Sequence, residues 1–290
     1  MTPVNRVHHT GMVVRSLNDA YAFYRDALGL RILKEEMIQD QGVRAALFDL
    51  GNSLLELLEP VEPDTGIARF LERRGEGLHH ICLEVNDIRG ALAGLKTHGV
   101  RLIDEAPREG LVGTIAFLHP SALNGVLVEL VEAAGSSPAD GGPSGGVGAG
   151  TRSQRLDHVV LAVQELEQAA VAWGEVFGLQ AAHTYRPEGT GMELALLPVG
   201  EPDQLGAFLE LVQATAADHR VARFIDERGQ GMFSIAIRVD DLDAAVRELL
   251  TKGVDIAQPE VGPLPDTRVA RIPPEAAHGV PVQLIERRRS

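Results

Sequence analysis

The sequence predicts an α+β protein built from four copies of one β-α-β-β-β module, arranged as two similar domains in tandem. Three observations predict this fold. The two halves of the chain match at fixed offsets, four amphipathic helix patterns each follow a short apolar strand pattern, and the same polar positions recur on otherwise apolar strands. A length of 290 residues and an apolar fraction of 44% suit two domains with aliphatic cores.

The first module begins with a strand expected over residues 7–14. A helix follows, with Ser16 as its N-cap and Gly29 as its C-terminal stop. Two further strands are expected over residues 43–50 and 54–58. The helix buries a stripe of apolar side chains at 3.6-residue spacing, namely Leu17, Ala20, Tyr21, Tyr24 and Leu28.

The second module repeats this order. A strand over residues 78–83 precedes a helix that begins after Asp87 and ends before Gly99, and strands are expected over 113–118 and 126–131. The helix stripe is Ile88, Ala91, Leu92 and Leu95.

The second half of the chain is a duplicate of the first. His9 matches His158 at an offset of 149 residues, whereas Glu56 matches Glu210 at an offset of 154. The third helix stripe is Leu166, Ala169, Ala170, Trp173 and Phe177, and the fourth is Leu242, Ala245, Val246 and Leu249. The larger offset holds for later pairs: Arg69 and Arg223, Val85 and Val239, Gly99 and Gly253, and Leu130 and Leu284.

The tract at residues 133–154 is rich in Gly, Ser, Pro and Ala and almost free of charge. Such a composition cannot bury enough surface to fold, so a flexible linker is expected there. The sequence therefore predicts a first domain at residues 1–132, the linker at 133–154, and a second domain at 155–290.

Charge and cysteine content narrow the classes of partner. A net charge of −14 argues against nucleic acid and anionic membranes, and any anionic substrate needs a local basic patch. The single cysteine, Cys82, lies in an apolar strand pattern and permits no disulfide within the chain. No signal-peptide pattern or membrane-length apolar run is present, so a cytoplasmic protein is expected.

Four polar side chains on apolar strands of the first half predict a metal site. His9, Glu56, His80 and Glu129 recur at matched module positions, and burying such groups is costly unless they are paired or bind a metal. The second half has His158 and Glu210 but Ser234 and Gln283 at the other two positions, so no tightly bound ion is expected there. We expect one degenerate site in that half.

The histidines beside two of these positions are expected to play other roles. Side chains alternate along a strand, so His8 and His79 should point away from the predicted ligand face. They are expected to support the ligands or to pack against a helix.

The motifs together resemble the vicinal oxygen chelate superfamily, also called the glyoxalase I, bleomycin resistance and dioxygenase superfamily, and within it methylmalonyl-CoA epimerases. The resemblance spans nearly the whole first half. It is carried by the segments Asn52–Pro60, Gly77–Ile81, Gly99–Pro107, Phe117–Pro120 and Gly125–Leu130.

The resemblance implies one divalent ion, Co²⁺, Ni²⁺, Mn²⁺ or Zn²⁺, held by His9, Glu56, His80 and Glu129. It further implies an isomerase or epimerase that acts through an enolate on a 2-substituted acyl-CoA or a related carbonyl acid, with Glu129 also serving as a base. The degenerate second half would complete a pseudo-dimer, so a monomer or a homodimer is expected.

The sequence departs from the epimerase pattern at Ala45, where the resemblance places the glutamate that serves as the second base. The residues that could replace this base are Glu35, Glu36, Asp49 and His79. Three other functions therefore stay open: a one-base lyase, cyclase or glyoxalase-type enzyme of specialised metabolism, a metal-free ligand-binding protein of the resistance type, and an iron dioxygenase. An intact set of four ligands disfavours the last two.

Overall fold

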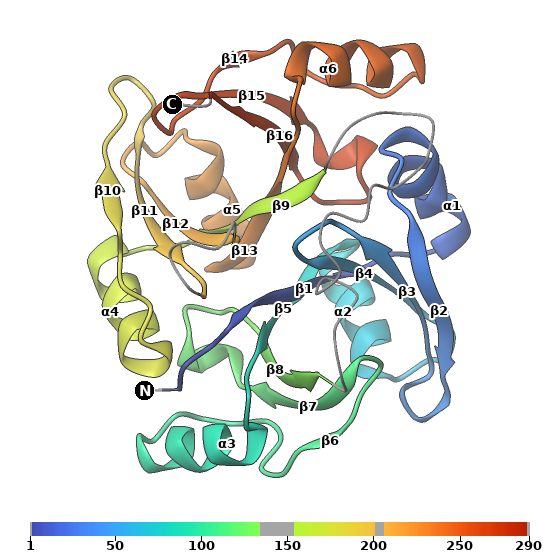
Figure 1. Ribbon diagram of the computed structural model, residues 1–290, viewed down its shortest axis with the longest axis vertical. Helices are drawn as coiled ribbons and strands as arrows, with labels where there is room; N and C mark the ends of the chain where they lie inside the picture. Colours follow the sequence, from blue (N-terminus) through green and yellow to red (C-terminus); the bar gives the residue numbers. More distant parts are fainter. Residues whose placement is uncertain (1, 134–153, 201–205, 289–290) are drawn as a thin grey trace. The chain divides into compact units, whose positions relative to one another are not determined.

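The computed structural model describes residues 2–133, 154–200 and 206–288, and it confirms the four-module α+β fold (Figure 1). Residues 134–153 of the predicted linker lie outside the described residues, so that linker stays a prediction. The described helices include none that is both long enough and apolar enough to cross a bilayer.

Each module contains one strand, one helix and three further strands, in the predicted order. The first module comprises β1 (Arg6–Val13), α1 (Leu17–Tyr21), β2 (Ile32–Ile38), β3 (Val43–Asp49) and β4 (Leu54–Pro60). The second comprises β5 (Gly77–Glu84), α3 (Ile88–Thr97), β6 (Arg108–Glu109), β7 (Gly113–Leu118) and β8 (Val128–Ala133).

The second half of the chain repeats both modules. The third comprises β9 (Arg155–Ala162), α4 (Leu166–Phe177), β10 (His183–Tyr185), β11 (Met192–Pro198) and β12 (Phe208–Ala214). The fourth comprises β13 (Gly231–Arg238), α6 (Leu242–Thr251), β14 (Glu260–Val261), β15 (Thr267–Ile272) and β16 (Val282–Arg287).

Two mixed sheets of eight strands each are formed, with matching topology. Their orders are β2-β3-β4-β1-β5-β8-β7-β6 and β10-β11-β12-β9-β13-β16-β15-β14. Within a module the last three strands pair antiparallel, as in β3 with β4 and β7 with β8. The first strand of a module pairs parallel with its last strand, as β5 does with β8 and β9 with β12. The two ends of a module that carry the predicted ligands are therefore neighbours.

The predicted caps of the first two helices are present. The Ser16 hydroxyl accepts a hydrogen bond from Asp19 N at 3.2 Å, and the Asp87 carboxylate accepts one from Gly90 N at 2.9 Å. Gly29 has a φ of 78°, which favours glycine at a helix end. After Tyr21 the first helix continues as a π-helix over Ala22–Ala27, whereas α4 stays α-helical.

Two helices between modules were not predicted. They are α2 (Gly66–Arg74) and α5 (Arg220–Arg228), which follow β4 and β12. Both have only one buried residue, Ala68 in α2 and Val221 in α5, so their apolar stripes are narrow. Their segments are dominated by polar and charged residues, which explains why a search for apolar stripes did not reveal them.

The folded chain divides into two compact units, and each unit combines modules from both halves. One unit contains the described residues 2–9, 80–133, 158–200 and 206–233, and the other contains 10–79, 154–157 and 234–288. Within the first unit Thr2 N donates to Val176 O at 2.9 Å, and within the second Tyr24 Oη donates to Ala277 O at 3.0 Å. The two copies are thus joined inside each unit, and the predicted domain bounds stay a prediction.

Candidate metal centre

Three of the predicted ligands bring their polar atoms together. His9 Nε2 lies 3.1 Å from His80 Nε2, and Glu129 Oε2 lies 3.2 Å from His9 Nε2 and 3.1 Å from His80 Nε2. All three residues are at most 4% exposed. Two imidazole nitrogens and a carboxylate oxygen facing one another in this way are a donor set for a divalent ion.

The sheet register explains why His80 and Glu129 share a face. In the parallel pairing of β5 with β8, Glu129 lies opposite Cys82. Paired residues point to the same side of a sheet, and His80 precedes Cys82 by two residues, so all three side chains project to one face.

The fourth predicted ligand, Glu56, lies on β4, the neighbour of β1 in the sheet order. In the antiparallel pairing of β4 with β3 it lies opposite Leu47, an apolar residue. Glu56 is only 6% exposed, although a glutamate is seldom buried unless a cation or a hydrogen-bond donor meets its carboxylate. The roles of the four residues as ligands stay a prediction.

Electrostatics favour the anionic form of Glu129. Burial alone raises the pKa of its carboxyl group, but the hydrogen bonds to His80 and His9 and the proximity of both imidazoles outweigh burial and hold that pKa well below its usual range. The carboxylate therefore stays ionised at neutral pH, in the form that binds a cation or accepts a proton.

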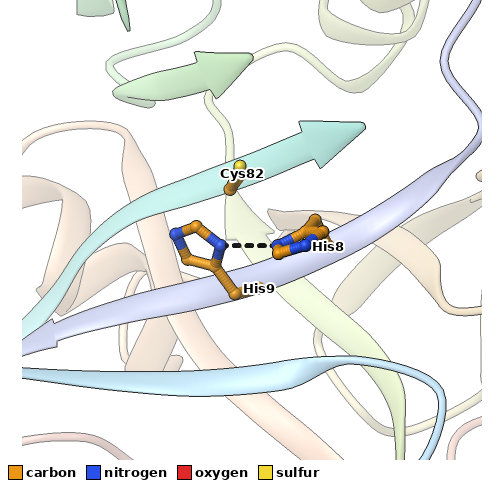
Figure 2. Close-up of side chains that lie close together, drawn as sticks. All are labelled: His8, His9 and Cys82. Atoms are coloured by element: carbon orange, nitrogen blue, oxygen red, sulfur yellow. Dashed lines mark hydrogen bonds between the residues drawn. The ribbon is translucent and has the colours of Figure 1, made fainter. Parts of the chain in front are cut away.

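His8, the residue beside the first predicted ligand, supports that ligand from behind. His8 Nδ1 lies 2.9 Å from His9 Nδ1, and the dashed line in Figure 2 marks this hydrogen bond. Burial, followed by the charges of His9 and Arg6, lowers the pKa of His8 to about 3, so its ring is neutral at pH 7. This agrees with the expected supporting role. If His9 presents a lone pair at Nε2, its Nδ1 carries the hydrogen and donates to His8.

Cys82 adjoins the same histidines, as Figure 2 shows. Its Sγ and one ring nitrogen each of His8 and His9 lie within 4.8 Å of one another, and Cys82 is fully buried. The apolar strand pattern around Cys82 indicated only a small core residue. Its position beside His8 and His9 was missed because register between strands decides it.

His79 packs against a helix, as expected. Its ring meets that of Phe70 of α2 edge-on, with centroids 5.0 Å apart. His79 thus contacts α2, while the adjacent His80 faces Glu129.

The second copy holds its polar residues in pairs. His158 Nε2 lies 3.5 Å from Glu210 Oε2, and Gln283 Nε2 donates to Ser234 Oγ at 3.3 Å. All four side chains are buried. A hydroxyl and an amide satisfy each other as neutral groups, which is a chemistry unlike that of the imidazole and carboxylate at the matched positions of the first copy.

The alternatives for a second base are engaged elsewhere. Ala45 is fully buried on β3 and has no proton to exchange. Glu35 accepts a hydrogen bond from Tyr21 Oη at 2.6 Å and another from Arg44 Nε at 2.8 Å, and these bonds lower its pKa. Glu36 pairs with Lys34 at 2.6 Å, and Asp49 pairs with Arg31 at 2.9 Å. None of these three carboxylates is as buried as that of Glu129.

The chain matches one protein family along both of its halves. The model of the Glyoxalase/Bleomycin resistance protein/Dioxygenase superfamily matches residues 8–117 and again residues 157–270. The chain belongs to this superfamily. The two matches coincide with the two halves of the internal duplication, so each half is a copy of the superfamily domain.

Several named relatives are similar to about half of the chain. Mitochondrial methylmalonyl-CoA epimerase of Bos taurus is 38% identical over 132 residues, which are 45% of this chain and 75% of that protein. Ethylmalonyl-CoA/methylmalonyl-CoA epimerase of Cereibacter sphaeroides is 39% identical over 130 residues, 44% of this chain and 97% of that protein. The uncharacterized protein YqjC of Bacillus subtilis is 44% identical over 133 residues, which are 46% of this chain and 95% of that protein.

A solved structure matches the tandem fold along the whole chain. It is a variant of 4-hydroxymandelate synthase from Streptomyces coelicolor, with a TM-score of 0.78 and 18% identity, covering 100% of this chain and 94% of that one. At this identity the match shows the fold alone. The tandem arrangement of two superfamily domains is therefore shared, and the activity is argued from the site.

Proposed function

We propose that this protein is a divalent-metal-dependent isomerase or epimerase that abstracts the proton next to the carbonyl of an acyl-CoA ester. The single observation that carries the proposal is the convergence of His9, His80 and Glu129, with polar atoms 3.1–3.2 Å apart in a buried position. The relatives of known name that match half of the chain are acyl-CoA epimerases, which supports an acyl-CoA substrate. We assign Glu56 as the fourth ligand.

The donor set fits a divalent ion such as Co²⁺, Ni²⁺, Mn²⁺ or Zn²⁺, because neutral imidazoles and carboxylates are ligands common to all four. When bound, such an ion acts as a Lewis acid toward a substrate carbonyl and makes the adjacent C–H more acidic. His9 and His80 would hold the ion, and a hydrogen bond from His9 Nδ1 to His8 would leave Nε2 of His9 available for it.

Glu129 is the residue that we assign to proton transfer. Its carboxylate is ionised at neutral pH and lies in a buried position where a proton on carbon can be reached without competing water. Because the two neighbouring imidazoles lower the pKa of its carboxyl group, Glu129 is a weak base, and the reaction depends on acidification of the substrate C–H. Removal of the ion is therefore expected to abolish proton exchange.

Ala45 favours a second candidate, one-base chemistry. Epimerisation needs a proton donor on the opposite face of the carbon, and Ala45 occupies the position assigned to it. A lyase, cyclase or glyoxalase-type reaction uses Glu129 alone. This alternative predicts proton exchange at the α-carbon with retention of configuration.

Deuterium wash-in from D₂O at the α-carbon of methylmalonyl-CoA tests the proposal, measured with metal-loaded and chelator-treated protein. Exchange is expected only with metal, and Glu129→Gln, which introduces the amide that the second copy has at Gln283, should reduce it at least about a hundredfold. Glu210→Gln makes the same chemical change at a buried glutamate of the second copy and serves as the control, so it should leave the rate unchanged. Exchange that survives chelation, or is lost equally in both variants, would refute the proposed centre.

A stereochemical assay separates the two candidates. Starting from one epimer, inversion accompanying exchange supports the epimerase, whereas exchange without inversion supports one-base chemistry. Absence of exchange with methylmalonyl-CoA at full metal occupancy would remove that substrate.

A further inference from the structure

A pocket of about 250 Å³ opens over α2, and its lining is unusually basic for so acidic a chain. Three arginines of α2 contribute, together with an imidazole from β5. The lining residues are Gly66, Arg69, Phe70, Arg73, Arg74 and His79. No carboxylate is among them.

The helical spacing places these side chains together. Arg69 and Arg73 are four residues apart and Gly66 and Phe70 likewise, so they share one face of α2. The three arginines are exposed, and the Phe70 ring packs edge-on against that of His79, which is only partly exposed. The pocket thus has an aromatic floor and a cationic rim.

Elsewhere in the first half, basic side chains mostly meet carboxylates of their own chain. The side chain of Arg73, by contrast, makes no hydrogen bond or ion pair with any side chain or backbone group in the described residues 2–39, 41–133, 154–200 and 206–288. The paired cations are Arg6 with Glu84, Arg25 with Asp26, Arg31 with Asp49, Lys34 with Glu36, Arg44 with Glu35, Lys96 with Glu105, and Arg108 with Asp104. The Arg73 guanidinium is therefore available to an anion, and the two neighbouring arginines add to the positive potential there.

In the second copy, α5 corresponds to α2, and the residues at the pocket positions differ. At the 154-residue offset, Arg220 stands for Gly66 and its guanidinium lies over the ring of Phe233, 5.6 Å from the centroid. In the first copy a Cβ added to Gly66 would meet nothing within 4 Å, so the corresponding space is open.

Two further differences change the chemistry of this position. Glu227 stands where the first copy has Arg73, and Phe233 stands where it has His79. Basic residues often stabilise the C-terminus of a helix, but that does not explain Arg73. The last turn of α5 contains one basic residue, Arg228, where the last turn of α2 contains both Arg73 and Arg74. The first copy has gained space, positive charge and an imidazole at one site.

We propose that Arg69, Arg73, Arg74 and His79 form a binding site for a phosphate-bearing small molecule. Guanidinium groups bind phosphate oxygens through paired N–H donors, and the phenylalanine edge gives an apolar contact to the attached organic group. We take the ligand to be the phosphates of a CoA ester, and this identification rests on the proposed function. The net charge of −14 makes such a local cationic site necessary for any ligand of this kind.

Isothermal titration of the purified, metal-loaded full chain tests the site. The probes are CoA, 3′-dephospho-CoA, pantetheine and inorganic pyrophosphate. Arg73→Glu, which introduces the residue of the second copy, is expected to weaken CoA binding about tenfold, the effect of losing one hydrogen bond to a charged group. Arg223→Glu on α5 is the matched control, because it changes net charge equally at an exposed helix position, and its affinity should equal that of the wild type.

A second variant separates a shaped site from general charge attraction. Gly66→Arg adds a positive charge but should fill the pocket as Arg220 does in the second copy, so CoA binding should weaken. Binding that tightens in Gly66→Arg, or that weakens equally in Arg73→Glu and Arg223→Glu, would overturn the proposal. Circular dichroism of each variant checks that α2 and α5 remain folded.

The probes distinguish failure here from failure of the proposed function. Weak binding of pantetheine with Arg73-dependent binding of CoA supports the site and its CoA source. Arg73-dependent binding of pyrophosphate but not of CoA supports the phosphate site and contradicts the CoA source. If no phosphate-bearing probe binds in an Arg73-dependent manner, the inference is wrong, whatever the outcome of deuterium exchange.

Discussion

The two copies of the superfamily domain keep the same fold and differ in the chemistry of a few buried positions. In the first copy, two imidazoles and a carboxylate converge within 3.2 Å, whereas in the second copy Ser234 and Gln283 satisfy each other with a hydrogen bond. The residue before the first ligand also differs: it is the neutral His8 in one copy and Asp157 in the other, where Arg287 binds its carboxylate at 2.7 and 2.8 Å. The matching sheet topology therefore depends on the apolar strand positions that both copies share, and the polar positions can differ without changing it.

The largest expected effect is the loss of bound metal when a ligand of the first copy is removed. His80→Ala should lower the bound divalent ion from about one per chain to less than about a tenth, because an imidazole that would bind the ion directly is lost. Ser234→Ala, the change at the matched position of the second copy, should leave the content unchanged. Elemental analysis after dialysis measures both, and equal metal content in the two variants would contradict the assignment.

Placing His and Glu at the two altered positions of the second copy should allow that copy to bind metal as well. The double variant Ser234→His with Gln283→Glu gives the second copy the residues that the first copy has beside His158 and Glu210. We expect the metal content to rise from about one to about two ions per chain. Content that stays at one in a folded double variant would show that strand positions alone do not make the site.

A moderate effect is expected from pH, through His8. Its pKa of about 3 lies below the ordinary 6.5, so between these values the unfolded chain binds a proton that the folded chain does not. The metal-free protein should therefore lose stability as pH falls below 6.5, by at most about 1.4 kcal/mol per pH unit from this group. His8→Asn, which cannot titrate, should show a correspondingly smaller slope in urea unfolding measured between pH ~7 and ~4.5. Parallel slopes in the two proteins would contradict this role.

The smallest effect is expected at Glu35, whose network exists only in the first copy. Tyr21 and Glu35 correspond to Ala170 and Thr184 in the second copy, so the network is not needed for the fold. Because its hydrogen bonds from Tyr21 and Arg44 lower the pKa of Glu35, it is a poor base. Glu35→Gln should change the deuterium-exchange rate by less than about twofold. A loss of epimerisation with exchange retained would instead identify Glu35 as the second base that Ala45 does not supply.

Hydrophobic periodicity predicted the four modules well because each of their helices buries a broad apolar stripe. Tyr24 and Trp173, matched by the duplication, are both fully buried. It did not reveal α2 and α5, because most of their residues are polar or charged and each buries only one side chain. The change from α- to π-helix after Tyr21 was likewise not predicted, since it depends on which carbonyl Leu28 N reaches, in this case that of Phe23 at 2.8 Å.

The chain by itself determined the duplication, the module order and the identity of the polar residues on apolar strands, because these depend on local pattern and on matching one segment with another. Only the tertiary structure decided that His8 and Cys82 adjoin His9, that Glu35 is held by Tyr21 and Arg44, and that the arginines of α2 line a pocket. Each of these depends on register between strands or on the packing of a helix against a strand. Such long-range distances are set by the folded sheet and are not encoded in any local spacing.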